Sequence, residues 1–145
     1  MNVQVKVLRD GAKILVAYDG SDYSMRALNE AISLAKKFSG SVTLLHVFWE
    51  PVAARRVEGT EVRDQPVIRL MGDAEKALKA SNVKHELRSE NSSQIPDTIL
   101  KVAKEGGFDT IAMGSRGMGG AKAWLLGSVS SKIAAESEIP VIITK

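Results

Sequence analysis

Glycine and serine residues form two short clusters in the C-terminal third of the chain, and their spacing suits the binding of an anion. The first cluster is Gly114-Ser115-Arg116-Gly117, and the second, Gly127-Ser128-Val129-Ser130, follows after nine residues. Glycine lets the backbone turn sharply and approach a ligand without a Cβ atom in the way. Free N–H groups at the start of a helix attract negative charge. The two clusters therefore predict a phosphate-binding loop and a nucleotide as the ligand.

Both clusters lie between a predicted strand and a predicted helix. Residues 109–113 form a short apolar run typical of a buried strand, and Val129 and Ile133 recur at helical spacing within residues 129–137. Sheets of α/β proteins bind their ligands at such strand-to-helix junctions. We expect phosphate or ribose oxygens to meet the backbone amides of Gly114, Arg116 and Gly117. We expect the outer phosphates to meet the backbone amides of Ser128, Val129 and Ser130. The hydroxyls of Ser128 and Ser130 are expected to be further donors.

The side chains around these clusters leave alternatives open. Arg116 can pair with a phosphate, or it can project into solvent from a loop. Lys122 and Lys132 are expected to be surface charges. Trp124 and Leu125 are expected to fasten the loop to the core or to a partner subunit.

Length and composition limit the class of protein. With 145 residues the chain fits one domain, and we expect a tail over residues 1–10 followed by one nucleotide-binding α/β domain over residues 11–145. No apolar run approaches the ~20 residues that span a bilayer. The N-terminal residues lack the pattern of a secretory signal, so we expect a cytoplasmic protein without a membrane partner.

Cysteine content and charge exclude further classes. The chain has no cysteine, which excludes disulfide bonds, thiol nucleophiles and thiolate metal ligands. Its net charge of +3 comes from basic residues scattered along the chain, and only 5% of the residues are aromatic, so we expect no specific nucleic-acid partner. His46 and His85 lack metal-ligand spacing and are expected to be structural.

Strand-like and helix-like segments alternate along the chain. Residues 13–18 and 41–48 are apolar runs without the polar alternation of a half-exposed strand, so both are expected to be buried parallel strands. Residues 83–89 are more polar and predict an edge strand. The last strand is expected at Val141–Thr144.

Apolar residues at helical spacing predict a helix in each connection between these strands. The first helix is expected to start at Ser21 or Asp22, and the third to be capped by Ser93. The second is expected over residues 66–80, capped by Asp64. Five strands joined by helical crossovers imply a parallel sheet with helices on both faces.

Three segments, in order along the chain, resemble the universal stress protein family. They are Lys13-Ile14-Leu15-Val16-Ala17-Tyr18-Asp19-Gly20-Ser21, the two glycine clusters with their spacing, and Ile139-Pro140-Val141-Ile142-Ile143. The phrase Gly114-Ser115-Arg116-Gly117-Met118-Gly119-Gly120 is similar to ATP-binding members of that family. The resemblance covers nearly the whole chain. It implies an α/β fold with a single doubly wound five-stranded parallel sheet, Rossmann-like, in the strand order 3-2-1-4-5.

That strand order would open the ends of the first and fourth strands into one crevice, so that Asp19 and Gly114 belong to one site. The Asp19 carboxylate can accept hydrogen bonds from ribose hydroxyls or approach a magnesium ion, or it can cap the helix that begins near Asp22. In the family, the matching aspartate contacts the nucleotide sugar.

The resemblance also implies which residues meet the base. Ala17 and Tyr18 match positions that lie against the base or the ribose, although Tyr18 is larger than the residue often found there. Val47 and Met113 match positions that line the adenine pocket, and either could belong to the core alone.

Motifs of other nucleotide-dependent enzymes are missing from the sequence. It has no Gly-x-x-x-x-Gly-Lys-Ser/Thr loop, no Gly-x-Gly-x-x-Gly after the first strand and no Gly-x-Ser-x-Gly elbow with triad partners. We therefore assign no catalytic residue and expect at most weak ATP hydrolysis. The expected function is an ATP-binding stress-response or signalling protein whose state or assembly is tuned by the nucleotide, with ATP, alone or with magnesium, as ligand.

Two other functions stay open. One is a nucleotide-independent interaction module that works through its dimer surface, and the other is a slow ATP hydrolase or phosphotransferase with Asp19 and Arg116 as its candidate groups. A homodimer is expected through Val141–Thr144, because the family's strand order leaves this apolar strand at an open edge. Residues 3–8, which alternate like a strand, could cover that edge instead.

Overall fold

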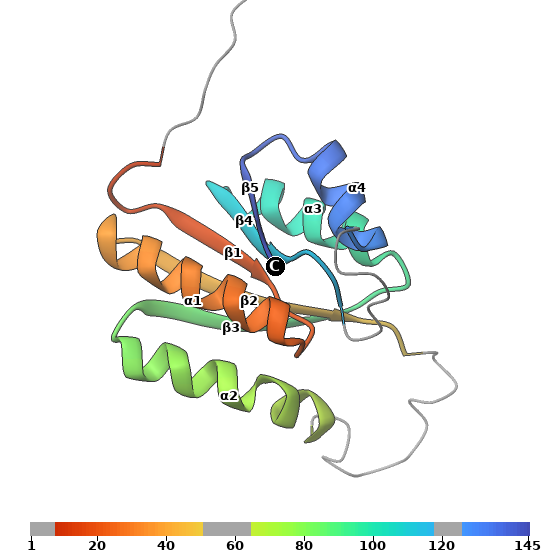
Figure 1. Ribbon diagram of the computed structural model, residues 1–145, viewed down its shortest axis with the longest axis horizontal. Helices are drawn as coiled ribbons and strands as arrows, with labels where there is room; N and C mark the ends of the chain where they lie inside the picture. Colours follow the sequence, from red (N-terminus) through yellow and green to blue (C-terminus); the bar gives the residue numbers. More distant parts are fainter. Residues whose placement is uncertain (1–7, 51–64, 118–125) are drawn as a thin grey trace, which may run out of the picture.

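The computed structural model describes residues 8–50, 65–117 and 126–145. Within these residues, five strands and four helices alternate along the chain (Figure 1). They are β1 (Lys13–Ala17), α1 (Asp22–Lys37), β2 (Ser41–Phe48), α2 (Gln65–Ser81), β3 (Lys84–Asn91), α3 (Ile95–Glu105), β4 (Thr110–Gly114), α4 (Ser128–Glu136) and β5 (Val141–Thr144). The predicted strands and helices are all present, with small shifts at their ends.

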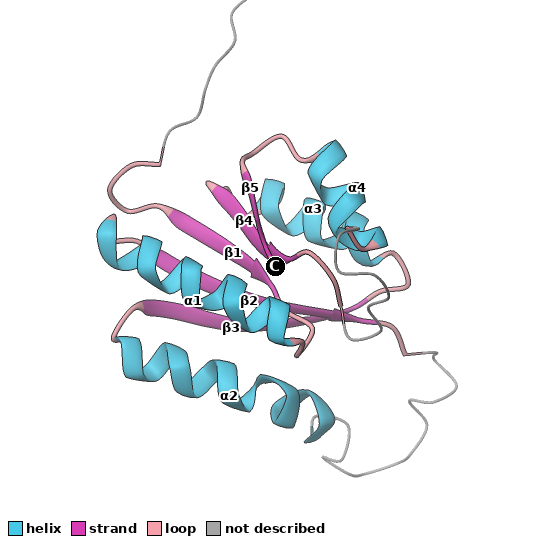
Figure 2. Ribbon diagram, viewed as in Figure 1, coloured by secondary structure: helices cyan, strands magenta, loops and turns pink. Residues whose placement is uncertain are grey.

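The strands form one parallel sheet in the order β3-β2-β1-β4-β5, which confirms the predicted fold class and strand order. α1 and α2 cover one face of the sheet, and α3 and α4 cover the other (Figure 2). From β1 the chain proceeds outward to β2 and β3, whereas from β4 it proceeds in the other direction to β5. The order therefore reverses between β1 and β4, and sheets of this kind bind ligands at the carboxyl ends of the strands on either side of the reversal.

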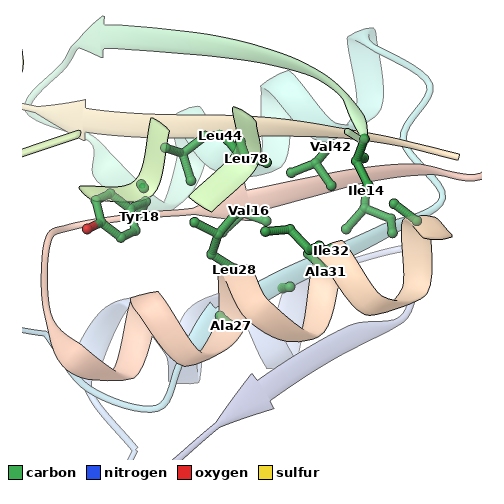
Figure 3. Packing of buried hydrophobic residues seen from close by; sticks show 14 of the residues in the cluster. Ile14, Val16, Tyr18, Ala27, Leu28, Ala31, Ile32, Val42, Leu44 and Leu78 are labelled. Atoms are coloured by element: carbon green, nitrogen blue, oxygen red, sulfur yellow. The ribbon is translucent and has the colours of Figure 1, made fainter. Parts of the chain in front are cut away.

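Two hydrophobic clusters fill the space between the sheet and its helices. On the face covered by α1 and α2, Ile14 and Val16 of β1 pack with Leu28 and Leu44 (Figure 3). On the other face, Leu15 of β1 belongs to the second cluster. Successive side chains of a strand point to opposite faces, and here both faces are buried. This double burial explains why β1 is apolar throughout instead of alternating.

α1 begins at a hydroxyl cap that lies next to the end of β1. Ser21 is the N-cap, because its Oγ accepts a hydrogen bond from the N–H of Ser24 at 3.1 Å. The choice between Ser21 and Asp22 is thereby decided in favour of Ser21. Asp22 lies in the first turn, where its negative charge complements the positive end of the helix dipole.

The predicted cap of α3 is wrong. The helix begins at Ile95 with Gln94 at the N-cap position, and no side chain caps it there. Ser92, and not Ser93, makes side-chain hydrogen bonds beside the helix start: its Oγ accepts from the N–H of Gln94 at 3.0 Å and from the hydroxyl of Thr98 at 2.8 Å. A proline early in the helix removes one N–H that would otherwise need a cap, which relaxes the need for a hydroxyl at the N-cap itself. Asp64, the predicted cap of α2, lies outside the described residues.

The two serines that the sequence offered as caps should respond differently to the same substitution. Ser21→Ala should lower the free energy of unfolding by about 1 kcal/mol, because α1 loses its N-cap acceptor. Ser93→Ala should change it by less than about 0.5 kcal/mol, because this exposed side chain caps no helix. Urea denaturation followed by circular dichroism measures both values. Equal losses for the two variants would contradict the assignment of the caps.

Candidate functional site

A cavity of about 500 Å³ opens at the carboxyl ends of β1, β2 and β4, beside the start of α4. Its size lies within the range of small-molecule sites. Every residue predicted from the sequence to touch a ligand lines it: Ala17, Tyr18, Asp19, Val47, Met113, Gly114, Arg116, Gly117, Gly127, Ser128, Val129 and Ser130. The lining also contains Ser24, Leu45, Ile95, Ile99 and Leu126, which the sequence analysis did not select.

The pairing of β1 with β4 brings the two halves of this lining together. In the parallel register, Ala17 lies beside Met113. The residues that follow each strand, Asp19 on one side and the glycine loop on the other, therefore leave the sheet at the same point. Segments almost a hundred positions apart in the sequence thus become two walls of one cavity.

Asp19 is held so that one carboxylate oxygen is used by the protein and the other faces the glycine loop. Its Oδ1 accepts a hydrogen bond from the N–H of Ser21 at 2.9 Å. Its Oδ2 is directed toward Gly117, where an added Cβ would lie only 2.6 Å from this oxygen. Asp19 is therefore not the N-cap of α1, which was one of the two alternatives. Instead, its carboxylate holds the backbone of Ser21, the residue that caps the helix.

Glycine is required in the first cluster because of close contacts. An added Cβ on Gly114 would lie 2.6 Å from the Cβ of Tyr23 and 2.8 Å from its carbonyl carbon, in the first turn of α1. Among the described glycines, a positive φ occurs only at Gly11, Gly20 and Gly107. Gly114 therefore serves by its small size, and neither it nor Gly117 and Gly127 has an unusual backbone conformation.

Arg116 lies in the wall of the cavity. The residue is only 9% exposed, which rules out the alternative of an arginine projecting into solvent. Because a guanidinium is always charged and presents several N–H donors, its presence in the lining favours a ligand with negative charge.

The first turn of α4 supplies backbone donors to the cavity. Gly127 is the N-cap and has no side chain to cap the helix, and the first bond of the helix is donated by the N–H of Ser131 to Gly127 at 2.9 Å. The N–H groups of Ser128, Val129 and Ser130 precede that bond, so the helix itself provides them with no acceptor. All three residues line the cavity. Uncapped amides at a helix start form an anion site.

The hydroxyl of Ser130 has a different role from the predicted one. It donates to the carbonyl oxygen of Ser115 at 2.8 Å and to that of Gly127 at 3.0 Å, so it is used within the protein instead of being a donor to a phosphate. The same carbonyl of Ser115 accepts the N–H of Gly127 at 2.7 Å. These bonds attach the start of α4 to the end of β4 and hold its amides in position.

The remaining lining is apolar. Leu45, Val47 and Met113 come from the sheet, and Ile95 and Ile99 come from the first turns of α3. Ile99 is 3% exposed and belongs to the core beneath α3. The start of α3 lies at the same edge of the sheet as the glycine loop, which brings both isoleucines to the cavity.

Comparison with known proteins agrees with this architecture. The family model described as the universal stress protein family matches residues 12–145. The chain belongs to the universal stress protein family. It is 34% identical over 146 residues to universal stress protein YxiE of Bacillus subtilis, covering 92% of this chain and 98% of that protein.

Solved universal stress proteins share the fold. One in complex with cAMP has a TM-score of 0.71 at 23% identity and covers 93% of this chain and 97% of its own. One from Archaeoglobus fulgidus in complex with dAMP has a TM-score of 0.69 at 20% identity and covers 96% of this chain and 100% of its own. At these identities the likeness concerns the fold.

Tyr18 joins the cavity of this universal stress protein to its core. The side chain is 5% exposed, and burial, followed by the charges of Asp73, Asp19 and Asp22, raises the pKa of its phenol above the usual value of 10.0. Its backbone carbonyl accepts a hydrogen bond from Nδ1 of His46 at 2.9 Å, so His46 carries a proton on that nitrogen. The buried phenol and the hydrogen-bonded carbonyl place Tyr18 in both the core and the wall of the cavity.

Other predicted charges lie away from the cavity or outside the described residues. Lys132 is a half-exposed residue at the surface whose Nζ lies 3.0 Å from Oδ1 of Asp97, and that carboxylate raises the pKa of the lysine. The prediction of a surface charge is confirmed for Lys132. Lys122, Trp124 and Leu125 lie outside the part of the chain that the structure describes.

The described ranges contain neither a cluster of metal-binding side chains nor a helix suited to a membrane. No group of three or more His, Cys, Asp or Glu side chains there is arranged to hold a metal ion. Asp19 is the one carboxylate in the described lining of the cavity. A single carboxylate fits a magnesium ion only when phosphates supply further ligands. None of the helices in these ranges has the length and apolar character needed to cross a membrane.

Two glycine-to-alanine substitutions should change stability in opposite directions. Gly114→Ala should lower the free energy of unfolding by about 1–3 kcal/mol, because the new methyl group overlaps the backbone of Tyr23. Gly72→Ala is the matched control in α2, where an added Cβ meets no atom within 4 Å, and it should raise the free energy of unfolding by about 0.5–1 kcal/mol. Thermal and urea unfolding measure both. A Gly114→Ala variant as stable as the wild type would refute the close packing of α1 on β4.

Proposed function

We propose that this universal stress protein binds ATP in the cavity between β1 and β4, and that the bound nucleotide tunes its state or assembly in stress response or signalling. The observation that carries the proposal is the combination of an uncapped helix start and a buried arginine in one cavity with an aspartate and an apolar wall. The first two groups suit phosphates, and the last two suit a sugar and a base.

The phosphates would meet the start of α4. The N–H groups of Ser128, Val129 and Ser130 and the positive end of the helix dipole attract negative charge. Arg116 adds a full positive charge from the other glycine cluster. Because the N–H of Gly127 and the hydroxyl of Ser130 both bind the carbonyl of Ser115, these donors are held in place before a ligand arrives. Such preorganisation lowers the cost of binding.

The nucleoside would occupy the remaining lining. Oδ2 of Asp19 is available as an acceptor for ribose hydroxyls, because Oδ1 is already bonded to Ser21. Val47 and Met113 present buried apolar surface to a base. The structures of other universal stress proteins in complex with cAMP and dAMP show that this fold accommodates adenine nucleotides in those proteins. The proposal for this chain rests on its own cavity.

Magnesium would enter with the nucleotide. ATP phosphates would supply most of its ligands, with Asp19 as the nearby carboxylate, and the ion would neutralise phosphate charge. The described lining offers a possible water-orienting carboxylate only in Asp19, one oxygen of which is already bonded to Ser21. We therefore propose at most weak hydrolysis, and binding as the main activity.

Isothermal titration calorimetry with ATP and with GTP, each with magnesium, tests the proposed ligand. ATP should bind, and GTP should bind about tenfold more weakly, because the apolar wall leaves its additional polar groups without hydrogen-bond partners. Absence of binding of both nucleotides, or equal affinity for the two, would refute the proposal.

The role of Asp19 is tested by a change that keeps its structural bond. Asp19→Asn retains an oxygen that can accept the N–H of Ser21 but removes the charge, so the melting temperature without ligand should change little. The dissociation constant for ATP should rise about tenfold, because hydrogen bonds from ribose to a charged oxygen are stronger. Asp22→Asn, at an exposed position outside the described lining, is the control and should bind as the wild type does. Equal affinities for all three would disprove the role.

We further propose a homodimer through β5. The two edges of the sheet differ in character: β3 has the sequence KHELRSEN, whereas β5 has the sequence VIIT. Charged side chains protect an edge strand from pairing, and an apolar edge invites it. Pairing of two β5 strands across a two-fold axis would satisfy their open backbone groups and extend the sheet. Residues 3–7 of the segment that could cover this edge lie outside the described residues.

Proline at Val141 tests the dimer without breaking the pairing with β4. The carbonyls of Pro140 and Thr144 accept bonds from β4, so the alternate residues, Val141 and Ile143, point their N–H groups to the open edge. Val141→Pro should therefore give a folded monomer, whereas Ile142→Pro should destabilise the fold itself. Sedimentation equilibrium and circular dichroism separate these outcomes. A wild type that stays monomeric at tens of micromolar would overturn the dimer.

A further inference from the structure

Thr144, the last residue of β5, makes hydrogen bonds that join separate parts of the cavity wall. Its backbone carbonyl accepts the N–H of Ser115 at 2.7 Å, at the start of the glycine loop. Its hydroxyl donates to the carbonyl of Tyr23 at 2.8 Å, in the first turn of α1, and lies at the longer distance of 3.4 Å from the carbonyl oxygen of Met113 in β4. Thr144 itself does not belong to the described lining of the cavity.

The residue reached by the hydroxyl bond is tied to the ligand side of the cavity. Tyr23 packs against Gly114 and precedes Ser24, which lines the cavity. Ser24 donates from its hydroxyl to the carbonyl of Ser21 at 2.9 Å and accepts the N–H of Asp19 at 3.4 Å. A short chain of contacts therefore runs from the outer strand to the aspartate.

The other side chains of β5 make no such link. Val141 and Ile143 pack against the cluster under α3 and α4, and Ile142 packs against the cluster under α1. These contacts are apolar and lack direction. The hydrogen bond from the Thr144 hydroxyl is directional, because its geometry requires the carbonyl of Tyr23 at a defined place.

We propose that Thr144 is a positioning residue for the nucleotide site and that it couples the outer edge of the sheet to the cavity. The inference rests on the proposed function and adds a route for its regulation. Through its bonds to Tyr23 and Ser115, Thr144 holds the first turn of α1 and the glycine loop in the arrangement that receives the ligand. Ligand binding stabilises this arrangement, and through it β5. Pairing at the outer edge of β5 and ligand binding therefore favour each other, since coupling between two sites is reciprocal.

The experiment compares four full-length proteins: wild type, Thr144→Val, Thr144→Ser and Ile143→Val. Valine keeps the branched shape of threonine and removes the hydroxyl, whereas serine keeps the hydroxyl. Ile143→Val is the matched control, because it shortens a β5 side chain on the opposite face of the sheet. Calorimetry gives the dissociation constant for Mg-ATP, and hydrogen–deuterium exchange of the peptide covering residues 139–145 is followed with and without ATP.

Thr144→Val should weaken ATP binding about fivefold, the factor that corresponds to one hydrogen bond. For Thr144→Ser and Ile143→Val, the dissociation constant for ATP should stay within about twofold of the wild-type value. ATP should slow exchange in the β5 peptide of these proteins and of the wild type, but not of Thr144→Val. A merely structural role for Thr144 would lower the melting temperature without abolishing this ATP-dependent protection.

The possible results distinguish the coupling through Thr144 from the proposed binding of ATP. A wild type that binds no ATP refutes the proposed function, and the coupling with it. A wild type that binds ATP, together with a Thr144→Val variant that binds equally well or keeps the protection of β5, refutes the coupling alone.

Discussion

The parallel pairing of β1 with β4 is the constraint on which the rest of the structure depends. Its register sets Ala17 beside Met113, and the strand order reverses across this pair. Because the crossovers on its two sides leave in opposite directions, none of the described helices covers the carboxyl ends of both strands, and a cavity remains there. The core supports the pair from both faces: Leu15 and Val16, consecutive residues of β1, are each fully buried on opposite sides of the sheet.

The close approach of α1 to β4 follows from this pairing and shapes the cavity. Gly114 allows the backbone of Tyr23 to lie directly against β4, a position that a larger residue would prevent. On the opposite side, α4 begins without a side-chain cap and is anchored to Ser115 instead. The first N–H groups of a helix find no acceptor within the helix itself, and an anion can supply one. The phosphates of the proposed nucleotide would supply such an anion.

Local patterns and resemblance predicted different parts of this picture. Apolar runs such as residues 41–48 indicate buried strands, because burial on both faces leaves a direct trace in the sequence. The strand order came from the resemblance, since the residues alone do not say which strands are neighbours. What escaped prediction depends on tertiary contacts. Ile95 and Ile99 reach the cavity only because of where α3 lies, and Ser130 uses its hydroxyl on Ser115, a partner fifteen positions away. Ser93 is not the cap of α3 because the helix begins at Ile95, which makes Gln94 the N-cap residue.

An NMR titration of the labelled protein with Mg-ATP tests the central claim most directly, because it reports both binding and its location. Backbone amide shifts should be largest at Gly117 and at Ser128, Val129 and Ser130, whose N–H groups would meet the nucleotide. Amides at the amino ends of β4 and β5, such as those of Gly107 and Glu138, should move little. Shifts that are largest at the amino ends of the strands, or no shifts at millimolar ATP, would contradict a nucleotide site between β1 and β4.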